Sequence, residues 1–357
     1  MRPDAIFLSI AFLAPVLLGG AALGYLRFAT RSGRRPGAAA VLTGNALFLL
    51  FLISALFLAL ELYYRYVYDA TDTANRSRLS SRWFERYWHV NADEIRDDID
   101  YAGPLAAGRR RITFLGDSYT TGHGISQVSD RFANRIRSAR PDWDVHVLAY
   151  NGINTVEQVD LLRRFLGEGY ELDVVVLVYV YNDIDSFIHE FQTFYRRIDI
   201  PPDLLAPLLA HSYAADLFYQ RWRQRQAALD SGIRYPVLRS EAYDGEPWES
   251  LEYTLGLLEA EVRDHGGRFA AVTFPWMQML DAGEVELPMY ARMEAHWRAR
   301  GVPHLQLLPV LQEHASAGLL VNRRDTHPNE RAHAIAADAI LEFLERDVVP
   351  APSRRVH

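Results

Sequence analysis

A serine directly after an apolar run is the first group in this sequence that could do chemistry. The segment ITFLGDSYTTGHG covers residues 112–124, and Ser118 stands where its apolar part ends. Parallel sheets bind ligands at the carboxyl ends of their strands, so a serine there could act as a nucleophile. Gly116 permits a tight turn, and Gly122 and Gly124 leave the approach to the hydroxyl open. Taken alone, Ser118 is better explained as a helix N-cap.

A carboxylate and an imidazole that could activate this serine stand together much later, in Asp325-Thr326-His327-Pro328. Residues i and i+2 of an extended segment share a face, and the residue before a proline is biased towards extended geometry. Asp325 can therefore orient the imidazole of His327 and stabilise its protonated form. Because proline is favoured at the first position of a helix, we expect Pro328 to open the last helix. The alternative is a capping aspartate and a surface histidine.

Two further motifs follow predicted strands and could donate hydrogen bonds. Asn151-Gly152 follows the second predicted strand, and Asn182 follows the third. The N–H of Gly152 and the amide of Asn182 could converge with Ser118 on one oxygen, as the stabilisation of an oxyanion requires. The alternatives are an ordinary turn for Asn-Gly and a helix cap for Asn182.

The other candidate groups receive structural interpretations. His123 is interpreted as a loop residue or a substrate contact, and Asp117 as structural. Asp183 could also orient His327, but a partner two residues away is simpler. We find no histidine and carboxylate cluster with metal-ligand spacing, and no glycine-rich phosphate loop, so we expect neither a metal nor a cofactor.

After residue 110, short apolar runs alternate with helical patterns. This alternation predicts a parallel sheet covered by helices on both faces. The predicted strands are residues 111–116, 144–150, 172–180, 268–274 and 303–308, and the predicted helices are residues 155–166, 248–265, 288–300 and 328–345. Residues 186–247, rich in aromatic side chains and arginine, interrupt the alternation as an insertion. The insertion is either a lid or substrate cleft, or a packed surface subdomain.

The order Ser118, Gly152, Asn182, then Asp325 and His327 resembles the four sequence blocks of SGNH hydrolases, also called GDSL esterases. The resemblance covers roughly residues 111–346 without the insertion. It implies a flavodoxin-like three-layer α/β/α sandwich with a mostly parallel five-stranded sheet. It also implies Ser118 as nucleophile, His327 as general base and Asp325 as its orienting partner, with an oxyanion hole from the Ser118 N–H, the Gly152 N–H and the Asn182 side chain.

The sequence departs from the family pattern at two points. Val180 stands where family members usually have a glycine two residues before the asparagine of the third block. The last block is Asp-x-His rather than the frequent Asp-x-x-His, a short form that also occurs in membrane-linked relatives that O-acetylate polysaccharides. An acyltransferase activity therefore stays open.

Two runs without charged side chains, residues 5–26 and 38–60, precede these motifs. Each reaches the roughly 20 apolar residues that a membrane-spanning helix needs. The loop between them is rich in arginine, and such loops stay cytoplasmic, so we expect a multi-pass protein of the bacterial inner membrane whose catalytic domain is periplasmic. The loop arginines are Arg27, Arg31, Arg34 and Arg35. A signal peptide in the first run, or two buried core helices, are the alternatives.

The expected organisation has four parts: residues 1–64 as the membrane hairpin, 65–110 as a juxtamembrane connector, 111–347 as the hydrolase domain and 348–357 as a flexible tail. The net charge of −7 argues against a nucleic-acid partner. The chain has no cysteine and no lysine, which excludes thiol nucleophiles, disulfides and Ser–Lys catalysis.

We therefore expect an extracytoplasmic serine esterase or deacylase that acts on an O-acyl ester of a carbohydrate or cell-envelope component. The expected partners are a small-molecule or glycan ester and, through residues 5–60, the lipid bilayer; the oligomeric state is open. The alternatives are a polysaccharide O-acyltransferase that uses the same triad, and a catalytically silent protein that binds glycan or organises an assembly.

Overall fold

The computed structural model describes residues 3–31, 37–73, 76–101, 103–191, 204–231, 235–280 and 288–349. The chain divides into two compact units. The hairpin unit comprises Met1–Ala70, Asn75–Trp83 and Ile198–Asp230, and the sheet unit comprises Thr71–Ala74, Phe84–Arg197 and Ser231–His357. The middle of the predicted insertion thus belongs to the hairpin unit. Arg34, Arg35 and most of the expected tail lie outside the described residues.

The sheet unit contains a five-stranded sheet in the order β2-β1-β3-β4-β5, and every pair of neighbours is parallel. The strands are β1 (Arg110–Gly116), β2 (Trp143–Ala149), β3 (Val174–Val180), β4 (Arg268–Phe274) and β5 (His304–Gln306). Each lies within or next to a predicted apolar run. β3, with the sequence VVVLVYV, is buried along its whole length, as expected for a central strand covered on both faces. The predicted α/β fold with a parallel five-stranded sheet is confirmed.

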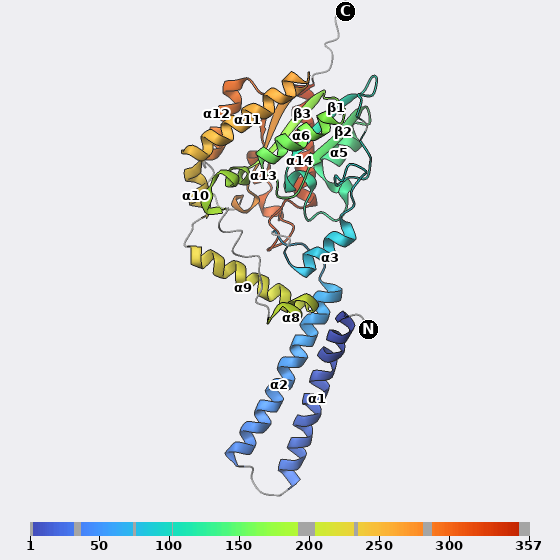
Figure 1. Ribbon diagram of the computed structural model, residues 1–357, viewed down its shortest axis with the longest axis vertical. Coiled ribbons are helices and arrows are strands. Elements are labelled where there is room, and N and C mark those ends of the chain that lie inside the picture. Colours follow the sequence, from blue (N-terminus) through green and yellow to red (C-terminus); the bar gives the residue numbers. More distant parts are fainter. Residues whose placement is uncertain are drawn as a thin grey trace, which may run out of the picture. The chain divides into compact units, whose positions relative to one another are not determined.

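Helices cover both faces of this sheet. From β1 through α5 (Phe132–Ala139) to β2 the chain moves one way across the sheet, and from β2 through α6 (Thr155–Gly167) to β3 it moves the other way. Because such crossovers are right-handed, the two helices must lie on opposite faces. α11 (Glu246–Asp264) packs beside α6, and α14 (Glu330–Phe343) packs beside α5 (Figure 1). The result is the expected three-layer arrangement.

The remaining elements of the sheet unit are short, apart from α12. They are α4 (Ser118–Thr121), η2 (Val128–Asp130), η3 (Tyr181–Phe187), α10 (Tyr235–Ala242), η4 (Met277–Met279), α12 (Pro288–Arg300), α13 (Leu308–Gln312), η5 (Ala315–Ala317) and η6 (Leu344–Val348). The hairpin unit has α1 (Pro3–Arg31), α2 (Ala38–Leu62), η1 (Tyr63–Val67), α8 (Ala206–His211) and α9 (Tyr213–Ser231). α3 (Arg78–Tyr87) begins in the hairpin unit and ends in the sheet unit.

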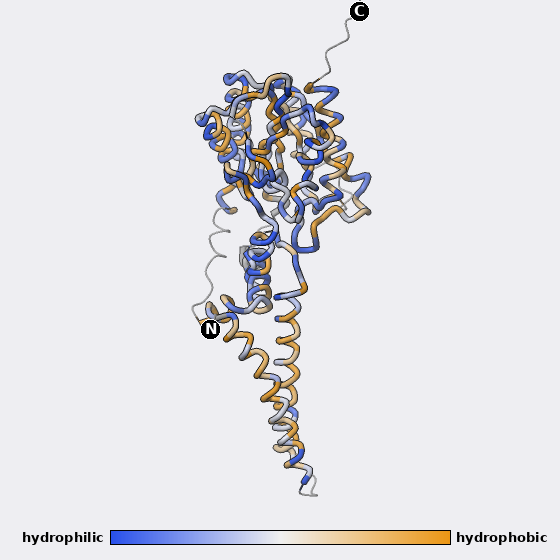
Figure 2. The backbone as a smooth tube through the Cα atoms, turned by 90° about the vertical axis from the view of Figure 1, so that its right-hand side faces the viewer, coloured by the Kyte–Doolittle hydropathy of each residue, from blue (hydrophilic) through white to orange (hydrophobic). Residues whose placement is uncertain are grey.

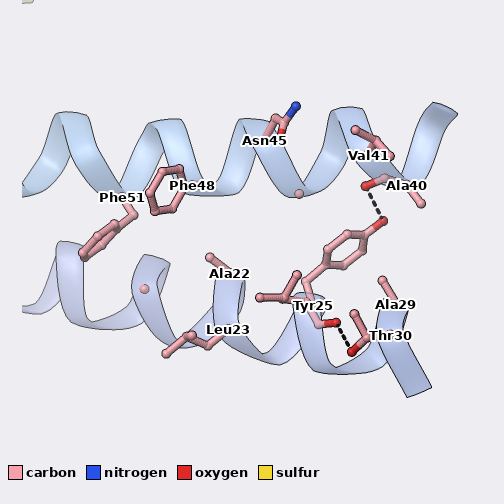
Figure 3. A pocket seen from close by; sticks show the side chains of 13 residues that line it. Ala22, Leu23, Tyr25, Ala29, Thr30, Ala40, Val41, Asn45, Phe48 and Phe51 are labelled. Carbon is pink, nitrogen blue, oxygen red and sulfur yellow. Dashed lines mark hydrogen bonds between the residues drawn. The ribbon is translucent and has the colours of Figure 1, made fainter. Parts of the chain in front are cut away.

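The two helices of the hairpin are long and apolar enough to cross a membrane. Figure 2 shows them as predominantly hydrophobic along their length, and most of their apolar side chains are exposed. Between them lies an apolar pocket lined by small and aromatic side chains, where the Tyr25 hydroxyl donates to the Ala40 carbonyl at 3.1 Å (Figure 3). In length and composition, the two helices therefore meet the requirement for crossing a membrane.

A buried carboxylate ties the end of α2 to the start of α9. Glu61 is fully buried and accepts hydrogen bonds from the Ser212 hydroxyl at 2.7 Å and from the Ala214 N–H at 3.0 Å. It also pairs with Arg65, one turn further along, at 2.8 Å. The carboxylate therefore satisfies N–H groups that the first turn of a helix leaves unpaired.

Candidate active site

The tight turn between β1 and α4 presents Ser118. A Cβ on Gly116 would meet the Thr120 hydroxyl oxygen at 2.1 Å and the Val178 carbonyl oxygen at 3.0 Å, so the turn needs glycine at this position. Asp117, not Ser118, is the N-cap of α4, because its carboxylate accepts the Tyr119 N–H at 3.0 Å. The N-cap interpretation of Ser118 is therefore wrong, and its hydroxyl is left for another partner.

That partner is His327, which lies 209 residues later in the chain. The Nε2 atom of His327 lies 2.9 Å from the Oγ atom of Ser118, and its Nδ1 atom lies 2.6 Å from Oδ1 of Asp325. The exposed fractions are 8% for Ser118, 6% for His327 and 0% for Asp325. The carboxylate and the imidazole are thus shielded from water, and the serine is the most accessible of the three.

The loop that carries Asp325 and His327 is held by its own backbone. The Val321 N–H donates to the His327 carbonyl at 3.0 Å, and the Asn322 N–H donates to the Asp325 carbonyl at 3.0 Å. α14 begins at Glu330 with Asn329 as its N-cap, so the expectation that Pro328 opens this helix is wrong. Pro328 instead pairs with Leu320 in an antiparallel bridge, which fixes the loop just after His327.

Burial and neighbouring charges set the protonation of this pair. Burial alone would raise the pKa of Asp325, but hydrogen bonds from His123 and His327 outweigh it and hold this pKa well below its usual range. Burial and the nearby His123 lower the pKa of His327, against the opposing effect of Asp325. The arrangement therefore favours a charged carboxylate beside a neutral imidazole, the state in which a histidine can accept a proton.

The expected oxyanion donors follow three adjacent strands, β1, β2 and β3. Gly152 is exposed and has a φ of +78°, in the left-handed region that favours glycine. The side chain of Asn182, which is half-buried in η3, donates from Nδ2 to Oδ2 of Asp117 at 3.3 Å. Burial raises the pKa of Asp117 to about 6, against the hydrogen bonds that it accepts from the Tyr119 N–H and the Asn182 amide. Asp117 thus links the serine turn to Asn182.

Asp183, the other carboxylate that could have oriented His327, bonds elsewhere. It is fully buried and accepts from the Thr155 hydroxyl at 3.0 Å and from the Gln158 amide at 3.3 Å, both on α6. Burial and the nearby Asp117 raise its pKa well above the usual value. It therefore joins η3 to α6, and Asp325 is the carboxylate that contacts His327.

Sequence reasoning missed two residues that contact Asp325. The Thr71 hydroxyl donates to Oδ2 of Asp325, although Thr71 belongs to the segment expected to be a connector. His123 lies with Nε2 at 3.3 Å from the same oxygen. The glycines on either side of His123 were a signal for a special turn, but nothing in the sequence pointed to Thr71.

His123, Asp325 and His327 also offer ligand atoms that lie within 4.8 Å of one another, a spacing that could hold a metal ion. In the geometry described here, His327 instead directs one ring nitrogen to Ser118 and the other to Asp325. The arrangement can therefore do proton transfer and nucleophilic chemistry without a metal ligand role for these residues.

No family model and no curated protein matches this chain. Solved structures do match it, and the three named below are 12% to 15% identical to it. A member of the lipolytic protein G-D-S-L family from Veillonella parvula is 12% identical, with 66% of this chain and 99% of that chain covered and a TM-score of 0.40. TesA is 13% identical, with 66% and 98% covered and a TM-score of 0.41.

A two-domain esterase active on acetylated mannans is 15% identical, with 69% of this chain and 54% of that chain covered and a TM-score of 0.37. The solved structures to which this chain is similar thus include a member of the G-D-S-L family, which its sequence motifs resemble.

Proposed function

We propose that this protein is a membrane-anchored serine esterase of the SGNH type that cleaves an O-acyl ester through an acyl-Ser118 intermediate. One observation carries the proposal: His327 bridges the Ser118 hydroxyl at 2.9 Å and the Asp325 carboxylate at 2.6 Å. A serine, a base and a group that orients the base, each within hydrogen-bond reach of the next, are what nucleophilic acyl transfer requires.

In the first step, Nε2 of His327 accepts the proton of Ser118 while Oγ forms a bond to the ester carbonyl carbon. Asp325 stabilises the imidazolium that results. The carbonyl oxygen becomes an oxyanion, for which the donors are the N–H groups of Ser118 and Gly152 and the side chain of Asn182. When the carbon–oxygen bond to the alcohol breaks, His327 returns the proton to the departing alkoxide, leaving an acyl-serine.

In the second step, water attacks the acyl-serine. His327 accepts a proton from the water as its oxygen bonds to the acyl carbon. The tetrahedral intermediate then releases Oγ of Ser118, which takes the proton back from His327. The products are a carboxylic acid and free enzyme. If a sugar hydroxyl takes the place of water, the same residues make an O-acylated glycan. An acyltransferase is therefore the second candidate function. The short Asp325-x-His327 spacing supports this candidate, because it also occurs in relatives that O-acetylate polysaccharides.

The two apolar helices support a location for this chemistry on the outer side of the inner membrane. α1 and α2 are long enough to cross a bilayer, and arginine-rich loops between such helices stay in the cytoplasm. The sheet unit would then face the periplasm, where O-acylated carbohydrates and other cell-envelope esters are the available substrates. We propose that the bilayer holds the enzyme near such a substrate.

The chemistry is tested with the full chain purified in detergent. Wild type should hydrolyse a short-chain aryl acetate and bind a fluorophosphonate probe, and Ser118→Ala should lose both. Ser138→Ala on α5 is the matched control, because its hydroxyl donates to the Asn134 carbonyl within the same helix. Wild type that never binds the probe would favour a catalytically silent protein. Acetate release that depends on an added glycan acceptor would favour the acyltransferase.

The orientation can be tested because the chain has no cysteine of its own. Tyr253→Cys introduces a thiol at a side chain that is 69% exposed in the sheet unit, and Gly37→Cys introduces one at the start of α2. A membrane-impermeant maleimide should modify Tyr253→Cys in intact spheroplasts and Gly37→Cys only after lysis. The reverse pattern would place the sheet unit in the cytoplasm.

A further inference from the structure

His123 lies against the proposed base and shares its carboxylate. Its ring stacks on that of His327, with 4.1 Å between ring centroids and 25° between ring planes. Its Nε2 atom is 3.3 Å from Oδ2 of Asp325, while Oδ1 of the same carboxylate binds Nδ1 of His327. With only 2% of its surface exposed, His123 has almost no access to solvent. Two imidazoles therefore hold the two oxygens of one buried carboxylate.

The turn that carries His123 is shaped for this contact. Gly122 and Gly124 have φ values of +74° and +84°, which side chains rarely tolerate. A Cβ on Gly124 would meet Val321 at 2.6 Å and Oδ2 of Asp325 at 3.0 Å. The Gly-His-Gly turn can therefore approach the Asp325 loop only because its flanking residues lack side chains.

The neighbours of His123 fix which ring nitrogen carries a proton. Nε2 faces two acceptors, Oδ2 of Asp325 at 3.3 Å and the Asp72 carbonyl oxygen at 3.2 Å, so it must be a donor. Nδ1 lies 3.1 Å from the amide nitrogen of Asn151, which donates to it. In this geometry Nδ1 is thus the acceptor of the ring and Nε2 is its donor.

We propose that His123 is a positioning residue for the esterase reaction. It holds Oδ2 of Asp325 so that Oδ1 stays in line with His327, and its ring face keeps the His327 ring aimed at Ser118. The proposal rests on the proposed function, because it assigns His123 an effect on the base rather than a contact with substrate. Thr71, which lies 254 residues before Asp325 in the sequence, donates to the same oxygen, so Asp325 Oδ2 has a second donor besides His123.

Two variants separate the two parts of this role. His123→Phe keeps an aromatic face for stacking and removes the N–H donor, whereas His123→Asn keeps an N–H donor and removes the stacked ring. His123→Phe should lower kcat for an aryl acetate by about 10-fold to 100-fold, the range expected for losing a hydrogen bond to a charged group. His123→Asn, which loses only the stacked ring, should lower kcat by about 2-fold to 10-fold, the range expected for losing one ring–ring contact. KM should stay within twofold, and the rate of fluorophosphonate labelling at Ser118 should fall by the same factor as kcat.

The control is His304→Phe, which removes a half-buried histidine from β5, where it bonds to Thr273 at 2.8 Å. Its kcat should match wild type, and thermal unfolding should confirm that all three variants are folded. If one His123 variant fails to fold, the kcat of the other variant still tests the proposal. Unchanged kcat in a folded His123 variant would overturn the proposal, as would a raised KM with unchanged kcat, which marks a substrate contact. Wild type that neither hydrolyses nor labels would instead overturn the proposed function.

Discussion

Two carboxylates are fully buried, Glu61 in the hairpin unit and Asp325 in the sheet unit. Each has lost its contact with water and accepts hydrogen bonds from protein groups instead, but the donors differ. Glu61 accepts from Arg65 at 2.8 Å, from the Ser212 hydroxyl and from the N–H groups of residues 213 and 214. Asp325 accepts from the Thr71 hydroxyl and from two imidazoles, those of His123 and His327. Both carboxylates are satisfied, as burial of a charge requires.

The difference lies in what the donors can do next. Backbone N–H groups and guanidinium groups do not change their protonation state near neutral pH, so the Glu61 cluster can only hold α2 and α9 together. Imidazoles titrate near neutral pH, so the Asp325 cluster can move a proton and keep its carboxylate charged. Similar burial therefore gives a structural joint in one unit and, by our proposal, a catalytic base in the other.

The largest expected effect comes from Asp325→Asn. The amide keeps the shape of the side chain but can hold His327 in the wrong tautomer, with its proton on Nε2 facing Ser118. A comparable change in a Ser-His-Asp triad lowers kcat about 10⁴-fold, and we expect a similar loss here. Steady-state hydrolysis of an aryl acetate measures it, with circular dichroism to show that the fold is kept. A loss below tenfold would mean that Asp325 is as structural as Glu61.

The counterpart variant, Glu61→Gln, should change stability and leave the chemistry alone. It removes the charge opposite Arg65, whose side chain is 8% exposed. Breaking a buried ion pair costs about 3 kcal/mol or more, and Asp4, 3.7 Å from Arg65, offsets only part of this. Thermal unfolding of the full chain in detergent should show the loss, whereas the kcat of the folded fraction should match wild type. A fall in kcat without destabilisation would contradict the assignment of Glu61 to structure.

The sequence predicted the sheet because alternating apolar runs are a local pattern, whereas the pairing of Ser118 with His327, 209 residues apart, was expected from the resemblance to SGNH hydrolases. Five apolar runs gave five strands, and strand ends in a parallel sheet converge on one edge, so Ser118 and Asn182 could be assigned to that edge. The Asp325 and His327 pair was predicted from a two-residue spacing before a proline. The prediction of where the last helix begins was wrong: Pro328 forms a bridge, and Asn329 is the N-cap of the helix.

The contacts of Thr71 and His123 could not be predicted in the same way. Thr71 and Asp325 are 254 residues apart, and a threonine in a polar stretch has no pattern of its own. His123 was visible beside the serine, but the carboxylate that it contacts comes from a distant loop. Long-range side-chain pairs of this kind depend on how the loops fold over the sheet edge, which periodicity does not encode.

The pH dependence of hydrolysis sharpens the comparison further. His327 must be neutral to accept the Ser118 proton, and burial together with His123 lowers its pKa from the usual 6.5. Activity should therefore be lost as pH falls through a pKa below 6.5 and be constant above it, until another group titrates. A kcat/KM profile between pH 4 and 8 measures this limb. Glu61→Gln should leave the apparent pKa of this profile unchanged. An apparent pKa above 6.5 would show that the effect of Asp325 on the pKa of His327 is larger than the effect of burial.

A smaller loss of kcat should come from Thr71→Val, which keeps the volume of the side chain and removes one donor to Asp325. Losing a hydrogen bond to a charged group costs about 1.5 kcal/mol or more, so kcat should fall about tenfold, the lower end of the range for such a loss and well short of the loss in Asp325→Asn. His123 still holds the same oxygen, which limits the damage. Combining Thr71→Val with His123→Phe leaves Asp325 Oδ2 without either donor, so the double variant should lose more than the product of the single losses. A purely multiplicative result would mean that the two donors hold Asp325 independently, and the shared-carboxylate argument would then apply to His123 alone.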